Sequence, residues 1–417
     1  MTIPYLNRAA GLLALISLLS ATSALKANTY SFDASLRERV NYLSSSFYAP
    51  LDRDDRWFWT QRLNLVGSYE SESGWGGRVN ILSALLEGVD ENTVNRNNLD
   101  IHELFIDAPL ADGRLRFGRQ ELLLGSQRFV GTREGTNVRR NWDGVRWTRQ
   151  WGETSIDAFY MELVDVTPNG AFNDSSESNR SLSGIYLTRQ FDQRGLDFYY
   201  LHSRKDQQLT IEGVADQRRE TVGVRHFGER GPWSWNHEVA YQFGRHGDLD
   251  IETWTVASIT GRQFEGAWQP ELRLSMNVAS GDDDPGDGEL GTFEALYPRG
   301  NYFSEAAVLG PSNFYNIHPQ VSIRPIETLT VNAGINWFWR LEKEDGVYGP
   351  SGLPFALPGA SGARAVSRSI SASVSWAFRP GQSLALDLTH STPRAFLKES
   401  GRGETLRFVQ VTYGTNF

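Results

Sequence analysis

The sequence predicts an all-β protein: a single antiparallel β-barrel of 18 strands that crosses a membrane. Three observations predict this fold. Apolar and polar residues alternate with a period of two along most of the chain, tight turns and long loops alternate strictly between the candidate strands, and the last strand is amphipathic and ends in Phe417. Helical periodicity is nearly absent from residues 28–417, so we expect this segment to form one domain.

Residues 1–27 are predicted to be a secretory signal peptide. Arg8 supplies a positive charge, residues 9–24 form an apolar run, and small residues precede Asn28, so cleavage after Ala24 or after Ala27 fits. The apolar run is shorter than the roughly 20 residues that a transmembrane helix needs. Because the chain has no cysteine, we expect backbone pairing and burial to stabilise the exported protein. The net charge of −9 argues against nucleic acid as a partner.

The alternation is clearest in residues 30–42, where Tyr30 and Phe32 fall on one face and Arg37 and Arg39 on the other. Polar faces carry Arg, Glu and Asn, while apolar faces carry aromatic rings toward the strand ends, which is typical of a barrel with lipid outside and water inside. The candidate strands lie near residues 30–43, 56–69, 74–86, 98–108, 113–124, 142–151, 154–164, 180–191, 195–204, 218–228, 233–244, 251–261, 266–279, 313–324, 327–341, 364–379, 382–391 and 404–417. Their connections predict short periplasmic turns and long extracellular loops, with both chain ends on the periplasmic side.

Eighteen strands enclose a lumen too wide for side chains to fill, so function should depend on what lines it. Alternation places a set of arginines inside, and arginine can hold and exchange carboxylates. The alternative is that these arginines brace the wall in ion pairs with acids such as Glu121, Asp143, Glu238 and Glu271. The inward set is Arg37, Arg39, Arg62, Arg78, Arg114, Arg116, Arg146, Arg273, Arg324 and Arg340.

Residues 112–150 carry nine arginines against four acids, contrary to the acidic balance of the whole chain. We expect the loop at residues 125–141 to fold into the lumen and to form the selectivity element. Alternation puts Arg119 on the lipid face with Phe117, at a cost of ~2–4 kcal/mol near the bilayer midplane. The sequence therefore predicts a β-bulge at Gly118 that returns Arg119 to the lumen, and a bend at Gly144.

The longest loop is acidic and rich in turn residues. Clustered carboxylates suit calcium, so Asp282, Asp283, Asp284 and Asp287 are a weak calcium candidate, with a solvated surface loop as the alternative. The spacing does not match an EF-hand loop. No other metal and no cofactor is expected.

The sequence does not predict an enzyme. Its seven histidines are scattered without the H-E-x-x-H spacing of a zinc site, and no G-x-S-x-G nucleophile motif occurs. A barrel hydrolase stays open as a lower-ranked alternative, because catalytic triads need no local sequence motif.

Several motifs together resemble the alginate export family of outer-membrane barrels. They are GRQE at 118–121, GSQR at 125–128, NVRRNWDGVR at 137–146, ASGDDD at 279–284, FEALYP at 293–298, WR at 339–340 and DGVY at 345–348. The resemblance implies an 18-stranded passive channel in the outer membrane of a Gram-negative bacterium, with an arginine-rich lumen for an acidic polysaccharide or another anionic solute. By the same resemblance, the residues that line or brace the conduit are Arg119, Arg128, Arg139, Arg140, Asp143, Arg146 and Arg340.

Three alternatives stay open at this point: a general porin for small acids or sugars, a barrel enzyme, and a structural barrel with a plugged lumen. The expected partners are outer-membrane lipid and, through the terminal Phe417, the machinery that inserts barrels into the outer membrane.

Overall fold

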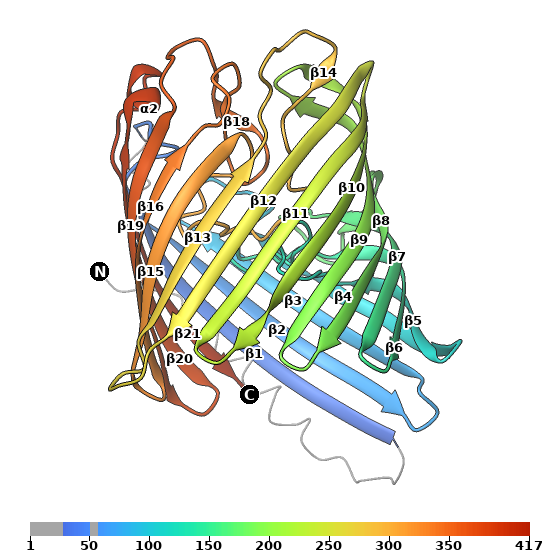
Figure 1. Ribbon diagram of the computed structural model, residues 1–417. Helices are drawn as coiled ribbons and strands as arrows, with labels where there is room; N and C mark the ends of the chain where they lie inside the picture. The colour runs from blue at the N-terminus through green and yellow to red at the C-terminus, as the bar shows by residue number, and fades with distance from the viewer. Residues whose placement is uncertain (1–27, 51–56) are drawn as a thin grey trace.

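The computed structural model describes residues 28–50 and 57–417, and these residues form a closed β-barrel (Figure 1). Each wall strand pairs antiparallel with its neighbours, and β1 pairs with β21 from Ser35 opposite Asn416 to Leu43 opposite Phe408, which closes the barrel. The wall consists of β1 (Asn28–Leu43), β2 (Trp57–Ser71), β3 (Gly76–Glu87), β4 (Asn97–Leu110), β5 (Gly113–Gln120), β6 (Trp142–Trp151), β7 (Thr154–Asp165), β8 (Ser175–Phe191), β9 (Arg194–Thr210), β10 (Gly213–Arg230), β11 (Trp233–His246), β12 (Leu249–Gln263), β13 (Glu271–Ala279), β15 (Phe314–Ile326), β16 (Leu329–Trp339), β19 (Ala365–Arg379), β20 (Gln382–Pro393) and β21 (Leu406–Asn416).

The predicted 18-stranded barrel is confirmed. The 19-stranded sheet contains these 18 wall strands and the two-residue β14 (Glu289–Leu290), which pairs with β12 from within a loop. The loops also hold a small hairpin of β17 (Val347–Tyr348) and β18 (Pro354–Ala356), and the short helix α2 (Ala395–Glu399). The predicted signal peptide, residues 1–27, lies outside the described residues.

Large apolar side chains cover the outer surface, because alternate residues of each strand point away from the lumen. Tyr30, Phe32, Ile106 and Phe117 are among the most exposed, and Phe117 retains 67% of its accessible surface. In an outer-membrane barrel this surface faces lipid. Among residues 28–50 and 57–417, no helix is long and apolar enough to cross a membrane.

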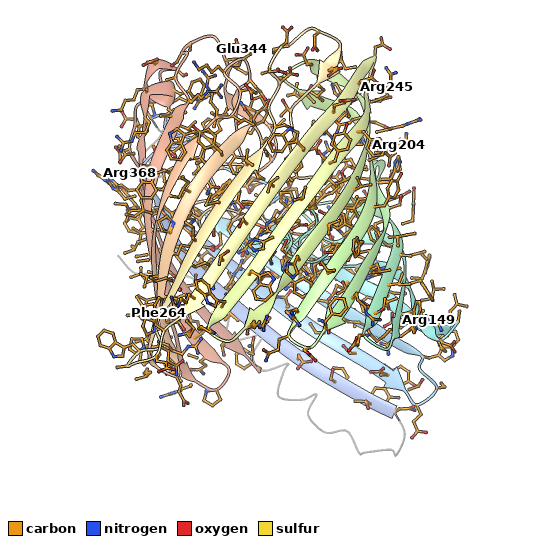
Figure 2. All side chains as sticks on the ribbon, viewed as in Figure 1. Arg149, Arg204, Arg245, Phe264, Glu344 and Arg368 are labelled. Carbon is orange, nitrogen blue, oxygen red and sulfur yellow. The ribbon has the colours of Figure 1, made fainter. Side chains whose placement is uncertain are left out.

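The two ends of the barrel differ as the sequence predicts, with one exception. Short turns and the C-terminus lie at one end, where Figure 2 places Phe264, and most long loops lie at the other. Residues 205–217 and 245–250, expected as loops, instead extend β9–β12 into tall hairpins with two-residue turns. Arg245 projects from this extension, and Arg204 lies just before it on β9 (Figure 2). The hairpins form because cross-strand pairing continues to Thr210 opposite Gly213 in one, past a register shift between Ala215 and Gln217, and to His246 opposite Leu249 in the other.

Strand β5 is short, so the segment that follows it can enter the barrel. It ends at Gln120, four residues before the predicted end at 124, so residues 121–141 leave the wall. The free edge of β4 is covered by the β7–β8 connection, where Asn98 N–H donates to Pro168 O at 3.2 Å and Phe172 N–H donates to Leu99 O at 3.0 Å. The wall therefore stays closed while the loop turns inward.

The predicted bulge at Gly118 is wrong. Gly118 lies opposite Phe105 on β4 and Gly144 on β6, and both registers run without a shift. Arg119 therefore stays on the same face as Phe117. Its charge is tolerated there because Asp143 lies directly opposite it and the β7–β8 connection covers it, so the strand needs no phase change.

Gly118 is nevertheless required. Its φ is +125°, and a Cβ atom would lie 2.3 Å from Leu104 O. We expect Gly118→Ala to destabilise the barrel by about 1–3 kcal/mol from backbone strain alone, and further from this contact. Unfolding in urea measures the effect. Gly213→Ala is the matched control, since Gly213 has φ +116° but open space around it. Equal losses for both variants would contradict a role for the close contact.

Candidate channel lumen

Residues 121–141, called the inward loop from here on, cross the inside of the barrel. On one side, Arg128 Nη1 contacts Glu238 Oε2 of β11 at 2.6 Å. On the other side, Asn137 Nδ2 donates to Gln61 O of β2 at 2.8 Å, and Arg39 Nη1 of β1 donates to Gly135 O at 2.7 Å. The prediction that this loop folds into the lumen is confirmed.

A second loop packs against the inward loop. It comprises residues 280–313 and is called the acidic loop. Gly131 N–H donates to Tyr297 O at 2.9 Å, Tyr297 N–H donates to Phe129 O at 2.8 Å, and Arg299 N–H donates to Gln127 O at 3.1 Å. The two loops together form a partition across the barrel.

Glu294 fixes the acidic loop to the wall. Its carboxylate contacts Lys205 of β9 and Arg219 of β10, and it accepts a hydrogen bond from Gln217 Nε2 at 2.7 Å. Burial by itself would raise the pKa of Glu294, but the adjacent cations Lys205 and Arg219 lower that pKa to about 2. The carboxylate is thus ionised at neutral pH, as its pairing with two cations requires.

On the loop side of the partition lies a cavity of about 370 Å³, called the vestibule. Five cationic side chains line it against three carboxylates, Asp165, Glu177 and Glu294. Three of the cations are paired with carboxylates: Arg139 with Glu121 and Glu134, Arg180 with Glu177, and Lys205 with Glu294. The other two cations are Arg133 and Arg140.

Arg133 and Arg140 have carbonyl partners. Arg133 Nη2 donates to Val138 O at 3.4 Å, and Arg140 Nη1 donates to Gly131 O at 3.1 Å and to Pro298 O at 3.3 Å. Neither guanidinium pairs with a carboxylate among the described residues. Burial lowers the pKa of Arg133 to about 10, and burial together with Arg133 lowers that of Arg140 to about 9. Both therefore stay cationic at neutral pH and can accept an anion.

On the other side of the partition is a cavity of about 450 Å³, called the lumenal cavity. Arg128, Arg273 and Arg299 line it together with Glu305 and Asp387. Most of its remaining lining is uncharged and polar: Ser126, Asn236, Ser275, Asn277, Asn301, Asn316, Gln320, Asn332, Ser371, Ser373 and Thr389. Hydroxyls and amides at this density can donate to and accept from a polyhydroxylated solute.

The remaining predicted site residues lie in the wall or in loop anchors. Arg119 Nε and Nη2 hold Asp143 Oδ1 and Oδ2, each at 2.9 Å, on the outward face beneath the β7–β8 connection. Arg146 Nε pairs with Asp157 Oδ1 at 2.9 Å, from β6 to β7. These two ion pairs brace neighbouring strands, and none of their residues lines either cavity.

Arg340, the first residue after β16 in the loop that leads to β19, is fully buried. Its guanidinium donates to Ala363 O at 2.8 Å, to Lys343 O at 2.6 Å and to Asp345 O at 3.0 Å, and also to Ser361 O. Its Cζ lies 4.0 Å from the centre of the Phe396 ring. The residue fixes loop backbone and does not line either cavity.

The four acids considered as bracing partners do form ion pairs. Glu121 pairs with Arg139, Asp143 with Arg119, Glu238 with Arg128 and Glu271 with Arg273. Sequence reasoning missed Lys205, Arg180 and Arg133 as vestibule residues. Arg133 was already inside the basic block of residues 112–150, whereas nothing in the sequence relates Lys205 or Arg180 to it.

The acidic segment does not assemble a calcium site. Asp282 Oδ1 accepts from Asp284 N–H at 3.3 Å and its Oδ2 from Gly291 N–H at 3.2 Å, while Asp287 Oδ1 accepts from Glu289 N–H at 2.8 Å. These carboxylates close their own turns, and Asp283 does not join them in a cluster. The described residues contain no group of three or more His, Cys, Asp or Glu that could hold a metal.

One serine–histidine hydrogen bond lies on the wall. Ser258 Oγ is 3.0 Å from His237 Nδ1, and cross-strand register places His226 next to His237. A nucleophilic serine needs a histidine that a third group orients, normally a carboxylate. The described hydrogen bonds of His237 and His226 include no carboxylate, and their other partner is Trp235.

Comparison with known proteins places this barrel in a family. The alginate export family model matches residues 28–410. The chain resembles the crystal structure of Pseudomonas aeruginosa OccK2 (OpdF) in complex with glucuronate, at 14% identity over 93% of this chain and 97% of that chain, with a TM-score of 0.61. It also resembles a BenF-like porin from Pseudomonas fluorescens Pf-5, at 11% identity over 93% and 99% of the two chains, with a TM-score of 0.63.

A third similar structure is Acinetobacter baumannii OccAB2, at 12% identity over 93% of this chain and 98% of that chain, with a TM-score of 0.61. At these identities the likeness shows the fold. The comparison with curated proteins gives no match. Because the family model spans nearly all of the barrel, this chain belongs to the alginate export family of Gram-negative outer-membrane β-barrel channels.

Proposed function

We propose that the protein is a passive channel for carboxylate-bearing sugars, and that hexuronates and their short oligomers fit it best. The observation that supports this most directly is the vestibule, where the Arg133 and Arg140 guanidiniums pair only with carbonyl oxygens. A buried cation without a carboxylate partner attracts an anion, and the guanidinium fork matches carboxylate geometry. The proposal includes that the arginines lining the two cavities make the lumen attractive to anions.

The permeant would meet two environments in series. Its carboxylate first binds weakly at the arginines of the vestibule, and its hydroxyl groups then bind the amides and hydroxyls of the lumenal cavity. Binding that is favourable but divided among several sites permits passage, because no single site holds the solute for long. The terminal Phe417, whose N–H donates to Ala34 O at 2.8 Å, would serve recognition by the insertion machinery.

Cavity size favours small solutes. Volumes of about 370 and 450 Å³ fall within the roughly 300–1,000 Å³ range of small-ligand pockets. The glucuronate complex of the similar OccK2 channel supports the same substrate class.

Export of an anionic polysaccharide is the second candidate function. The family match supports it. A continuous polymer would require the inward and acidic loops to move aside, because they meet across the barrel through backbone hydrogen bonds.

Planar-bilayer conductance tests the proposal. We expect Arg133→Gln/Arg140→Gln to lower the anion-to-cation permeability ratio and to raise the half-blocking concentration of glucuronate on the order of tenfold, since hydrogen bonds to charged groups contribute about 1.5–3 kcal/mol. Arg245→Gln, which removes a charge from the exposed hairpin of β11, is the matched control and should change neither quantity. Cation selectivity in the wild type, or block by glucose equal to block by glucuronate, would contradict the proposal.

A further inference from the structure

Three wall arginines converge on the tip of the inward loop. Arg37 and Arg39 of β1 and Arg62 of β2 lie on the lumenal face of neighbouring strands, with Arg37 directly opposite Arg62. The loop itself adds Arg139, which also pairs with Glu121 at 2.7 Å, and the carboxylate at the centre of the cluster, Glu134.

Glu134 contacts three of these guanidiniums at once. Its Oε1 pairs with Arg62 Nη2 and lies 3.1 Å from Arg37 Nη1, while its Oε2 lies 3.3 Å from Arg139 Nη1. Burial by itself would raise the pKa of Glu134. The pKa is nevertheless below its ordinary value, because the carboxylate lies beside Arg62, Arg139 and Arg37. The carboxylate is therefore ionised, and its contacts are those that a carboxylate ligand of an arginine site would make.

The burial of the partners is unequal. The side chains of Arg37 and Arg62 are only 11% and 8% exposed, whereas that of Glu134 is 52% exposed. Arg37 and Arg62 are therefore held in the wall, whereas about half of the Glu134 side chain stays accessible. A second carboxylate could thus replace the first without any movement of the arginines.

The guanidiniums also have unused donors. Nε of Arg37 and both Nε and Nη1 of Arg62 are buried without a hydrogen-bond partner among the described residues. Buried donors normally have partners, because an unmet donor costs free energy. Glu134 alone does not satisfy this group of cations.

The loop does not need Glu134 to stay in place. Arg37 Nη2 donates to Thr136 O at 2.7 Å and Arg39 Nη1 to Gly135 O at 2.7 Å. Asn137 Nδ2 donates to Gln61 O at 2.8 Å and to Leu85 O at 3.1 Å. These anchors at residues 135–137 hold the loop directly after Glu134 and leave its side chain free for another role.

We propose that Arg37, Arg62 and Arg139 form a carboxylate-binding site in which Glu134 is a built-in ligand, displaced by the carboxylate of a permeating hexuronate. This inference rests on the proposed function and identifies where the permeant carboxylate binds at the inward loop. Glu134 would act as a competitor for the site. If Glu134 occupies the site for most of the time, the apparent affinity for the carboxylate of a solute falls in proportion to the fraction of time that the site is empty. The weaker binding prevents the arginine cluster from retaining the solute.

Glucuronate block of single channels in planar bilayers tests the site, with glucose as the neutral probe. We expect Glu134→Gln, which keeps the size of the side chain, to lower the half-blocking concentration of glucuronate on the order of tenfold, as for a competitor that occupies its site about nine-tenths of the time. Glucose block should not change. Glu134→Gln/Arg62→Gln should lose the gain, because the site itself is then incomplete.

Glu153→Gln is the matched control: it removes a carboxylate that pairs with Arg189 at 3.2 Å, lines neither cavity and does not touch the cluster. It should leave the half-blocking concentration of glucuronate within about twofold of wild type, as expected for removal of a largely exposed pair. Folding of each variant is checked by its heat-dependent mobility in detergent gels. If Glu134→Gln leaves glucuronate block unchanged or weakens it while the wild type is blocked, the built-in ligand is refuted and the channel function stands. If glucuronate blocks neither protein, the proposed function fails and this inference fails with it.

Discussion

Arg128→Ala is expected to destabilise the barrel by about 3–5 kcal/mol and to release the inward loop, because it leaves Glu238 as an uncompensated buried charge. The side chains of Arg128 and Glu238 are 8% and 4% exposed. Glu238 also accepts from Ser126 Oγ at 2.8 Å and from Tyr199 OH at 2.9 Å. This network is the anchor of the loop on the β11 side, so its loss affects both stability and the width of the passage.

Two measurements check this expectation. Urea unfolding gives the loss in free energy, and planar-bilayer recording should show a larger and noisier single-channel conductance than that of the wild type. Arg245→Ala is the control, since its pair with Asp250 is exposed and should contribute only about 0–1 kcal/mol. A stable Arg128→Ala variant with wild-type conductance would show that the anchor on β11 is dispensable.

Arg340→Ala is expected to have the second largest effect, a loss of about 3–5 kcal/mol, because truncating a buried charged donor leaves several carbonyls unpaired. Four backbone carbonyls and the face of Phe396 depend on this one guanidinium. Arg340→Lys should rescue only part of the loss, since a single ammonium cannot reproduce the planar fork.

The same variant separates structure from selectivity. Arg340 lines neither cavity, so the population of Arg340→Ala that folds should keep the wild-type anion-to-cation permeability ratio. Urea unfolding and reversal potentials are the two measurements. Arg364→Ala, which removes an exposed arginine 3.8 Å from Glu342 in the same loop, is the control and should change neither. A shift in ion selectivity for Arg340→Ala alone would place Arg340 on the permeation path after all.

Strand identity was well predicted, because a period of two is a local property of the chain. Residues 142–151 were predicted as a strand and are β6, and residues 113–124 were predicted as a strand whose first eight residues are β5. The errors occurred at ends. β9 continues past 204 to Thr210, and β10 starts at Gly213 rather than at 218, because the two strands pair with each other there. No local signal in the sequence marks how long two strands stay paired.

The site was predicted less well, because charge alone does not tell a brace from a binding residue. Arg119 and Arg133 both lie in the basic block, yet Arg119 is held by Asp143 while Arg133 faces the vestibule with only a carbonyl partner. The difference depends on which acid lies across from each arginine. Asp143 reaches Arg119 through strand register, and Glu134 reaches Arg62 through a loop that returns across 72 residues of sequence.

Alternation and short motifs are local properties of the chain, so the barrel, its strand number, its lipid-facing surface and its family could all be predicted from the sequence. Only the tertiary structure decided that β5 stops early, that the inward and acidic loops meet across the lumen, and that Glu134 lies among Arg37, Arg62 and Arg139. The physical reason is that ion pairs and loop–loop hydrogen bonds join residues far apart in the chain. Their partners are chosen by geometry after the wall has closed.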